Sequence, residues 1–391
     1  MRVDAPGLNR TEHCWSGFRI TCQKGENQMN AFQLPVVNPP LKGFLRWAYT
    51  LSITSIHEET MPWYYSNFIQ MFCKKNFLED GRQYYVDFFR GKPNELNFNN
   101  PFLLTCSVNY TILESLALDA WPKFFADQIQ NGYYCVVFLD EARLSPAASY
   151  QKEPFPHHLF LYGFDWEESV FNASMFDHTG VYRNLQIPFR EFQDAVQSMR
   201  HLLKERLTAD HHTYFYKYEP HSPYPFDKTA AIDQLRDYLN GETHLNRINY
   251  NSDNEEAFGI KVYDYLQLYF DAVEGNDSRL GDRNDVRHLH VLWEHKKMMS
   301  ERIGYLVDEG IIPYDEELVA GYKDITKRAM KLRDQYIRHE IREDKEMFER
   351  LRLRFDEFQK EEPVLLQKLI TLLEGSKESL VSTCGTRCDT Y

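Results

Sequence analysis

Four β-prone runs follow one another at short spacing in the middle of the chain. They are YYCVVFL (133–139), HLFLYGF (158–164), SVFNASMF (169–176) and VYRNLQIPF (181–189). Turn-forming residues separate the runs, and this pattern favours neighbouring antiparallel strands arranged as a meander. The run TYFYKYEP (213–220) predicts one further strand.

The segments around the predicted sheet have a helical pattern. FLRWAYTLSITSI (44–56) suits a buried helix, and PWYYSNFIQMFC (62–73) suits a second one. Helices are also predicted over 113–130 and 190–206. Residues 29–225 are therefore expected to form one α+β domain, with helices first and the antiparallel sheet after them.

From about residue 228 the chain is predicted to be helical. The clearest pattern is a heavily charged helix over 328–362, which Pro363 would end and a short helix up to Gly375 would follow. Its row of apolar side chains, called the apolar stripe below, consists of Met330, Ile337, Ile341, Phe348, Leu351, Phe355 and Phe358. We expect the stripe to pack inside a helical domain, residues 226–375. A homo-oligomer formed through this helix as a coiled coil is the alternative.

The chain is acidic, with 45 Lys and Arg against 58 Asp and Glu and a net charge of −13. Such a chain is a poor candidate for wrapping nucleic acid. Residues 1–28 lack the apolar core of a signal sequence, and no stretch of 18 consecutive apolar residues occurs. The sequence predicts a cytoplasmic protein without a membrane segment, with tails at 1–28 and 376–391.

The sequence predicts no metal site and no cofactor. The seven cysteines are irregularly spaced, and most are expected to be buried thiols in a reducing compartment. Cys384 and Cys388 lie in the polar C-terminal tail, and their spacing alone is a weak indication of zinc. A group of histidines in the helical domain comprises His288, His290 and His295. On a helix the first two diverge, which does not favour a shared metal ion.

Two adjacent histidines, His157 and His158, stand at the start of the second predicted strand. Papain-like enzymes carry a histidine on a strand and an acid or amide on the next strand, which orients the ring. Their nucleophile is a cysteine at the N-terminus of a buried helix, where the helix dipole and the facing imidazolium stabilise the thiolate. The expected chain order is cysteine, helix, histidine strand and acid strand.

Six segments carry a resemblance to a known family. They are QLPVVNPPLKGFLRWAYTLSI, PWYYSNFIQMFC, NGYYCVVFLDEARL, PHHLFLYGFD, IPFREF and DVRHLHVLWEHKKMMSERI, in this order between residues 33 and 303. In these segments the chain resembles the butirosin biosynthesis protein H family and its papain-like relatives in bacterial peptide-antibiotic and siderophore clusters. The resemblance implies a papain-like domain followed by a helical one. It also implies cysteine acyl transfer from a carrier-protein thioester to an amine.

The resemblance also implies site residues. It puts the active-site histidine at His157, six residues before Gly163, with His158 on the opposite face of the strand. The position of the family's cysteine falls at Gly43, which bears no nucleophile and is therefore expected to be a degenerate nucleophile position. The nearest carboxylate on the following strand is Asp177, which could form a general-base pair with His157.

The missing cysteine leaves three hypotheses about function open. The first is an accessory protein of peptide natural-product biosynthesis that binds an acyl or peptidyl carrier protein, or its tethered intermediate, without covalent catalysis. The second is an active acyltransferase or amidohydrolase that uses Cys14, Cys22 or non-covalent chemistry at His157. The third is a scaffold protein that binds its partner through the apolar stripe. Cys73 and Cys135 are expected to lie in the core.

Overall fold

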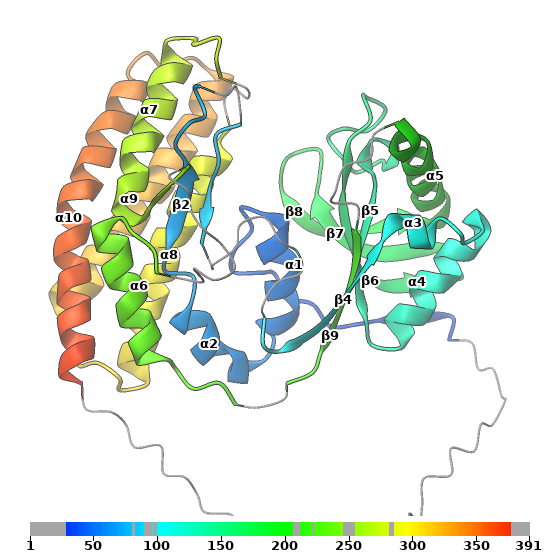
Figure 1. Ribbon diagram of the computed structural model, residues 1–391, viewed down its shortest axis with the longest axis horizontal. Coiled ribbons are helices and arrows are strands. Elements are labelled where there is room, and N and C mark those ends of the chain that lie inside the picture. Colours follow the sequence, from blue (N-terminus) through cyan, green and yellow to red (C-terminus); the bar gives the residue numbers. More distant parts are fainter. Residues whose placement is uncertain are drawn as a thin grey trace, which may run out of the picture.

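The computed structural model describes most of the chain between residues 29 and 376. The described residues are 29–79, 83–89, 96, 100–205, 212–220, 223–244, 255–280 and 285–376. They form a sheet unit and a mostly helical unit that lie side by side (Figure 1). The predicted N-terminal tail, and the C-terminal tail beyond Ser376, lie outside the described residues.

The sheet unit is built on a seven-stranded antiparallel sheet. Its strands are β1 (Ala31–Gln33), β4 (Leu103–Asn109), β5 (Tyr134–Asp140), β6 (Pro156–Asp165), β7 (Val170–Phe176), β8 (Tyr182–Pro188) and β9 (His212–Tyr218). The order is β4-β9-β5-β6-β7-β8, with β1 paired to β6. The meander predicted from the spacing of the β-prone runs is therefore confirmed as β5 to β8. The fifth predicted strand, β9, lies between β4 and β5.

Side chains of β5 alternate between two packed faces of this sheet, as the two-residue period of a strand requires. Cys135, Val137 and Leu139 belong to the core under α4 (Trp121–Gln130) and α5 (Phe189–Glu205). Tyr134 and Val136 face α1 (Leu45–Thr54) on the other side. The helix predicted over 113–130 is divided: α3 (Tyr110–Leu113) ends first, and α4 begins at Trp121 with a proline in its first turn.

Helix α1, which the sequence predicts as a buried helix, lies between the two units (Figure 1). Trp47 and Leu51, one turn apart, belong to the core of the helical unit. Tyr49 and Ile53 project from the opposite side and pack against the sheet. Helix α1 therefore joins the two units, and its N-terminal end points to the space between them.

The helical unit combines six helices with a small sheet. The helices are α2 (Met61–Ser66), α6 (Lys228–Asn240), α7 (Val262–Glu274), α8 (Arg287–Asp308), α9 (Glu316–Ile341) and α10 (Met347–Gly375). The strands β10 (Glu256–Phe258), β2 (Met71–Lys74) and β3 (Val86–Phe88) form an antiparallel sheet in that order. The prediction of one helix over 62–73 is wrong in its second half. Helix α2 ends at Ser66, because the backbone of Asn67 is already extended. Phe68 follows with a positive φ of 56°, and β2 begins at Met71.

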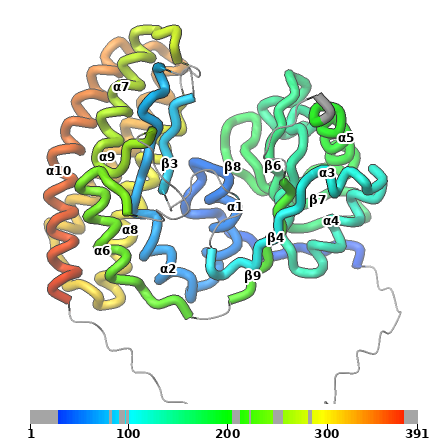
Figure 2. Tube along the Cα trace, in the orientation of Figure 1, coloured from blue at the N-terminus to red at the C-terminus, as the bar shows by residue number. Residues whose placement is uncertain are grey.

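The helical unit takes segments from both sides of the boundary predicted near residue 225. Leu41, Trp63 and Phe102 share one buried cluster with the side chains of α6 to α10. Figure 2 shows the trace running from β1 in the sheet unit to β2 and β3 beside the C-terminal helices, and then back to β4. The class predicted from the sequence, α+β with a helical C-terminal region, is confirmed. In the described residues no helix combines the length and apolar character needed to cross a membrane.

The apolar stripe spans two helices instead of one. Helix α9 ends at Ile341, which is 76% exposed, whereas Phe355 and Phe358 of α10 are fully buried in the core of their own unit. Pro363 lies inside α10 and does not end it, which corrects the prediction. A proline removes one helical hydrogen bond. The helix continues because the leucines beyond it, including Leu366 and Leu369, are buried in the same core.

Candidate functional site

A cavity of about 810 Å³ lies at the junction of the two units, a size typical of small-molecule sites. Its helical wall is formed by the segment that leads into α1 and by parts of α8 and α9. Its other wall is formed by the ends of β5, β6 and β7 and the loops beside them. Gly43, His157 and Asp177, which are far apart in the sequence, all line this cavity.

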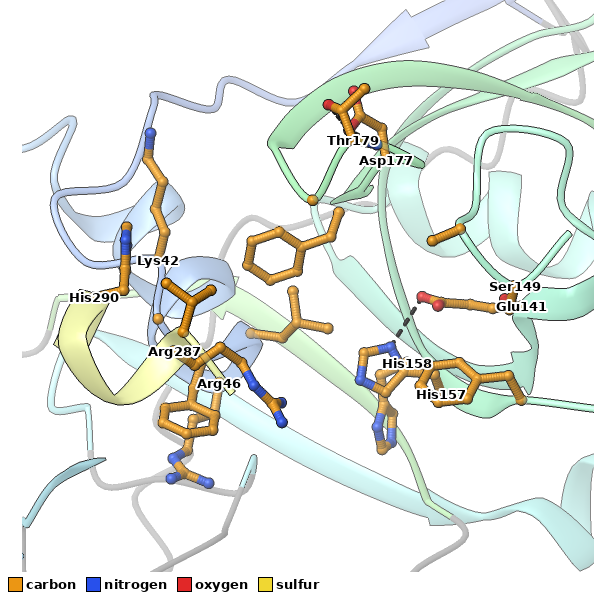
Figure 3. Close-up of a pocket in the computed structure, with 18 of the residues that line it drawn as sticks. Lys42, Arg46, Glu141, Ser149, His157, His158, Asp177, Thr179, Arg287 and His290 are labelled. Carbon is orange, nitrogen blue, oxygen red and sulfur yellow. Dashed lines mark hydrogen bonds and ion pairs between the residues drawn. The ribbon is translucent and has the colours of Figure 1, made fainter. Parts of the chain in front are cut away.

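His157 is the residue of the sheet wall whose ring is held by a carboxylate. Its Nδ1 lies 2.9 Å from Oε1 of Glu141, and Figure 3 shows this pair facing the basic side chains across the cavity. The Glu141 side chain is 9% exposed, whereas that of His157 is 37% exposed. Because a carboxylate accepts, the neutral ring carries its proton on Nδ1 and keeps a lone pair on Nε2. No hydrogen bond joins Nε2 to another described residue, so the pair can accept a proton or a hydrogen bond from a ligand.

The sheet register brings Glu141 to this position. Leu139 of β5 pairs with His157 of β6, and Asp140 pairs with Pro156, so the residue after β5 stands beside the histidine. Asp140 fixes the turn that follows. Its buried carboxylate accepts hydrogen bonds from the backbone N–H of Ala142 at 3.1 Å and from the N–H of Phe155 at 2.8 Å.

His158 also lines the cavity. The two-residue period of a strand directs adjacent side chains to opposite faces, but the cavity lies at the end of β6, where both rings reach its lining. The His158 ring has its own partners: its Nε2 lies 3.1 Å from the carbonyl oxygen of His212, and its ring centroid lies 4.9 Å from that of Phe138. These contacts give His158 a mainly structural environment.

Asp177 lines the cavity without a hydrogen bond to His157. Its Oδ1 accepts from the N–H groups of Thr179 at 2.9 Å and Val181 at 3.1 Å, and its Oδ2 accepts from Nε of Arg183 at 2.5 Å. Desolvation raises the pKa of Asp177, but these hydrogen bonds outweigh it and hold the pKa well below its usual range. Asp177 therefore organises the turn after β7, and the hydrogen-bonded carboxylate of His157 is Glu141.

Gly43 is buried and lies two residues before α1. Its N–H donates to Oε2 of Glu294 at 3.0 Å, and the N–H of Lys42 donates to Oε1 of the same carboxylate. A Cβ on Gly43 would point at α8, 2.6 Å from Cγ2 of Val291. The assignment of this position as a degenerate nucleophile site stays a prediction. The structure gives a second reason for a glycine, the close approach of α8.

None of the cysteines in the described part of the chain lines the cavity. Cys73 and Cys135 are fully buried, as predicted, and burial raises the pKa of the Cys73 thiol to about 12 and that of the Cys135 thiol well above its usual value. Cys106 is exposed on β4. Cys14 and Cys22 lie outside the described residues. Thiols with a raised pKa are poor nucleophiles, so Cys73 and Cys135 are structural.

The three histidines of α8 do not form a metal site. Nε2 of His290 lies 3.1 Å from Oε1 of Glu294, whereas Nε2 of His295 lies 2.8 Å from the carbonyl oxygen of Ile69 in the core. The ring of His288 packs between aromatic side chains. Within the described residues no cluster of three His, Cys, Asp or Glu is arranged to hold a metal ion, and Cys384 and Cys388 lie outside them.

Two carboxylates that hold predicted site residues, Glu141 and Glu294, were not predicted from the sequence. Glu141 carries a usable signal, because it directly follows a strand that precedes the histidine strand. Glu294 carries none, since it reaches Gly43 across about 250 residues of chain. No protein-family model and no curated protein sequence matches this chain.

Proposed function

We propose that the chain is an accessory protein of bacterial peptide natural-product biosynthesis that binds an acyl or peptidyl intermediate in the cavity without covalent catalysis. The supporting observation is a histidine held by a carboxylate, His157 and Glu141, in a cavity whose described lining contains no cysteine. A papain-like architecture and a carrier protein as the donor of the intermediate are part of this proposal. Both come from the resemblance of the six segments.

The His157–Glu141 pair gives the proposal its chemistry. Nε2 of the neutral ring would accept a hydrogen bond from an amide or amine N–H of the ligand. If the ring took a proton, the Glu141 carboxylate would stabilise the imidazolium. Ser149 and Thr179 also line the cavity, but neither hydroxyl is hydrogen-bonded to His157 in the described structure. No activated hydroxyl therefore replaces the cysteine in the described lining.

The orientation of His157 also favours a second function, non-covalent acyl transfer. The amine of an acceptor would attack the thioester carbonyl while Nε2 takes the amine proton. The C–N bond would form, the C–S bond would break, and the proton would pass from His157 to the leaving thiolate. This route needs no acyl-enzyme, so it is compatible with Gly43.

Calorimetry with the full chain tests the binding function. The ligand is an acyl thioester of N-acetylcysteamine, and His157→Gln is compared with the control His201→Gln, a change at an exposed residue of α5. We expect one site, roughly tenfold weaker binding in His157→Gln because the hydrogen bond from the ligand to Nε2 is lost, and no change in the control. Equal affinity in all three proteins would contradict the proposal. Amide formation with an added amine, lost in His157→Gln, would establish the second function.

A further inference from the structure

The two walls of the cavity differ in charge. The helical wall carries four basic side chains, Lys42, Arg46, Arg287 and Arg333. The lining contains two carboxylates, Glu141 and Asp177, both on the sheet side. Both are already engaged within the sheet unit, Glu141 with His157 and Asp177 with Arg183. In a chain with a net charge of −13, this concentration of cations does not follow from composition.

The arginines are held from outside the cavity. Nε of Arg287 donates to Oδ1 of Asp285 at 2.8 Å, and Nε of Arg333 donates to Oδ1 of Asp334 at 2.9 Å. Arg46 pairs with the buried carboxylate of Asp87. None of the three aspartates belongs to the lining, so the counter-ions lie behind the guanidinium groups and not in the cavity. The Arg333 guanidinium also lies 4.2 Å from the centroid of the Trp293 ring. These contacts fix the side chains, so the basic wall is organised before a ligand arrives, which lowers the entropy cost of binding.

Apolar side chains complete the lining, including Phe44, Phe155, Phe176 and Ile337. A charge beside apolar walls interacts more strongly with a counter-ion than it would in water. A lining in which four basic side chains face two carboxylates also favours ligands of negative charge. The cavity therefore offers an apolar surface to the body of a ligand and basic side chains to an anionic group at one end of it.

We propose, building on the proposed function, that the natural ligand is an amphipathic organic anion. Its carboxylate or phosphate group binds at the basic wall near Lys42, Arg287 and Arg333. Its apolar body lies against the aromatic side chains, and its hydrogen-bond donor faces His157. The same wall disfavours polyamines and other cationic ligands.

Two fluorescent probes test this inference on the full chain. Anilinonaphthalene sulfonate is an apolar anion, and N-phenylnaphthylamine has the same body without the sulfonate. We expect the anion to bind at least tenfold more tightly than the neutral probe, with an affinity that falls as salt rises. In Lys42→Gln/Arg287→Gln, and separately in Arg333→Gln, this ratio should fall severalfold. Arg236→Gln is the matched control, since Arg236 is 54% exposed and pairs with Glu374 away from the cavity.

Displacement of the bound sulfonate by hexanoate or by hexyl phosphate then shows which anion the basic wall prefers, and hexylamine should not compete. Equal binding of the two probes, or a ratio unaffected by all three basic-wall substitutions, would overturn the inference. His157→Gln should leave the ratio unchanged. A selective basic wall with thioester binding insensitive to His157 would refute the proposed function alone. Thioester binding that depends on His157, together with a basic wall that does not select the anionic probe, would refute this inference alone.

Discussion

Replacing Gly43 by alanine tests why a glycine stands where α8 meets the segment leading into α1. The added Cβ would lie 2.6 Å from Cγ2 of Val291 and 3.0 Å from Oε2 of Glu294. Val291 is β-branched and lies in a helix, where its χ1 angle is restricted, so it cannot easily rotate away. We therefore expect the substitution to push α8 away from α1.

The size of the effect follows from two opposing terms. Overpacking of a buried site costs about 1–3 kcal/mol. Gly43 has no positive φ, so alanine adds no backbone strain and recovers about 0.4–1 kcal/mol by restricting the unfolded chain. The net loss is about 1–2 kcal/mol, which lowers the melting temperature of a chain of this size by about 1–3 °C.

Urea denaturation of the full chain measures this loss. Gly304→Ala is the control, because Gly304 lies in α8 with no atom within 4 Å of its added Cβ. It should stabilise the protein by about 0.5–1 kcal/mol. In a Val291→Ala background most of the cost of Gly43→Ala should disappear. A Gly43→Ala protein as stable as the wild type would refute the close-approach explanation, and so would a loss that persists without the Val291 methyl groups.

Two further predictions concern buried ionisable groups. Lys296→Met should lower the free energy of unfolding, measured with urea, by about 3–5 kcal/mol. It leaves the buried carboxylate of Glu362, 2.7 Å from Nζ of Lys296, without its ion-pair partner. The control Lys297→Met, which removes a surface ion pair, should lower it by less than about 1 kcal/mol. Burial lowers the pKa of His288 to about 4, so as the pH falls from 6.5 the unfolded chain takes up a proton that the folded chain does not, and stability falls. Asp87 acts in the opposite direction, because burial raises its pKa to about 6. The free energy of unfolding is therefore measured at pH 7 and at about pH 5, in the wild type and in His288→Phe. The loss of stability between the two pH values should be smaller in His288→Phe. A similar loss in both proteins would contradict the role of His288.

The sheet was predictable because each of its central strands has a clear signal in the local sequence. Each run from 133 to 189 is β-prone and bounded by turn residues. The short strands of the helical unit have no such signal. Strand β2 continues an aromatic segment whose first part is helical. A short irregular stretch separates the two, with an extended Asn67 and a positive φ at Phe68. Short apolar segments do not distinguish helix from strand by periodicity, so tertiary packing decides.

The candidate site was predictable in part. The resemblance pointed to Gly43, His157 and Asp177, and all three line one cavity, but it did not give the hydrogen-bond partner of each. The contact between Glu141 and His157 depends on the register of two strands, which the sequence does not specify. Lysines are normally solvated, and no local pattern in the sequence marks Lys296 as an exception. Lys296 is fully buried because Glu362 of α10, remote in the sequence, pairs with it.

The intact mass of the full chain after incubation with the acyl thioester tests the central claim, binding without a covalent intermediate, most directly. The account predicts no acylation that depends on His157. Any mass gain, such as acylation of the exposed Cys106 thiol, should be equal in the wild type and in His157→Ala, because Gly43 supplies no nucleophile and the thiols of Cys73 and Cys135 are buried with raised pKa values. One acyl group on Cys14 or Cys22 in the wild type, absent from His157→Ala, would contradict it and establish covalent acyl transfer.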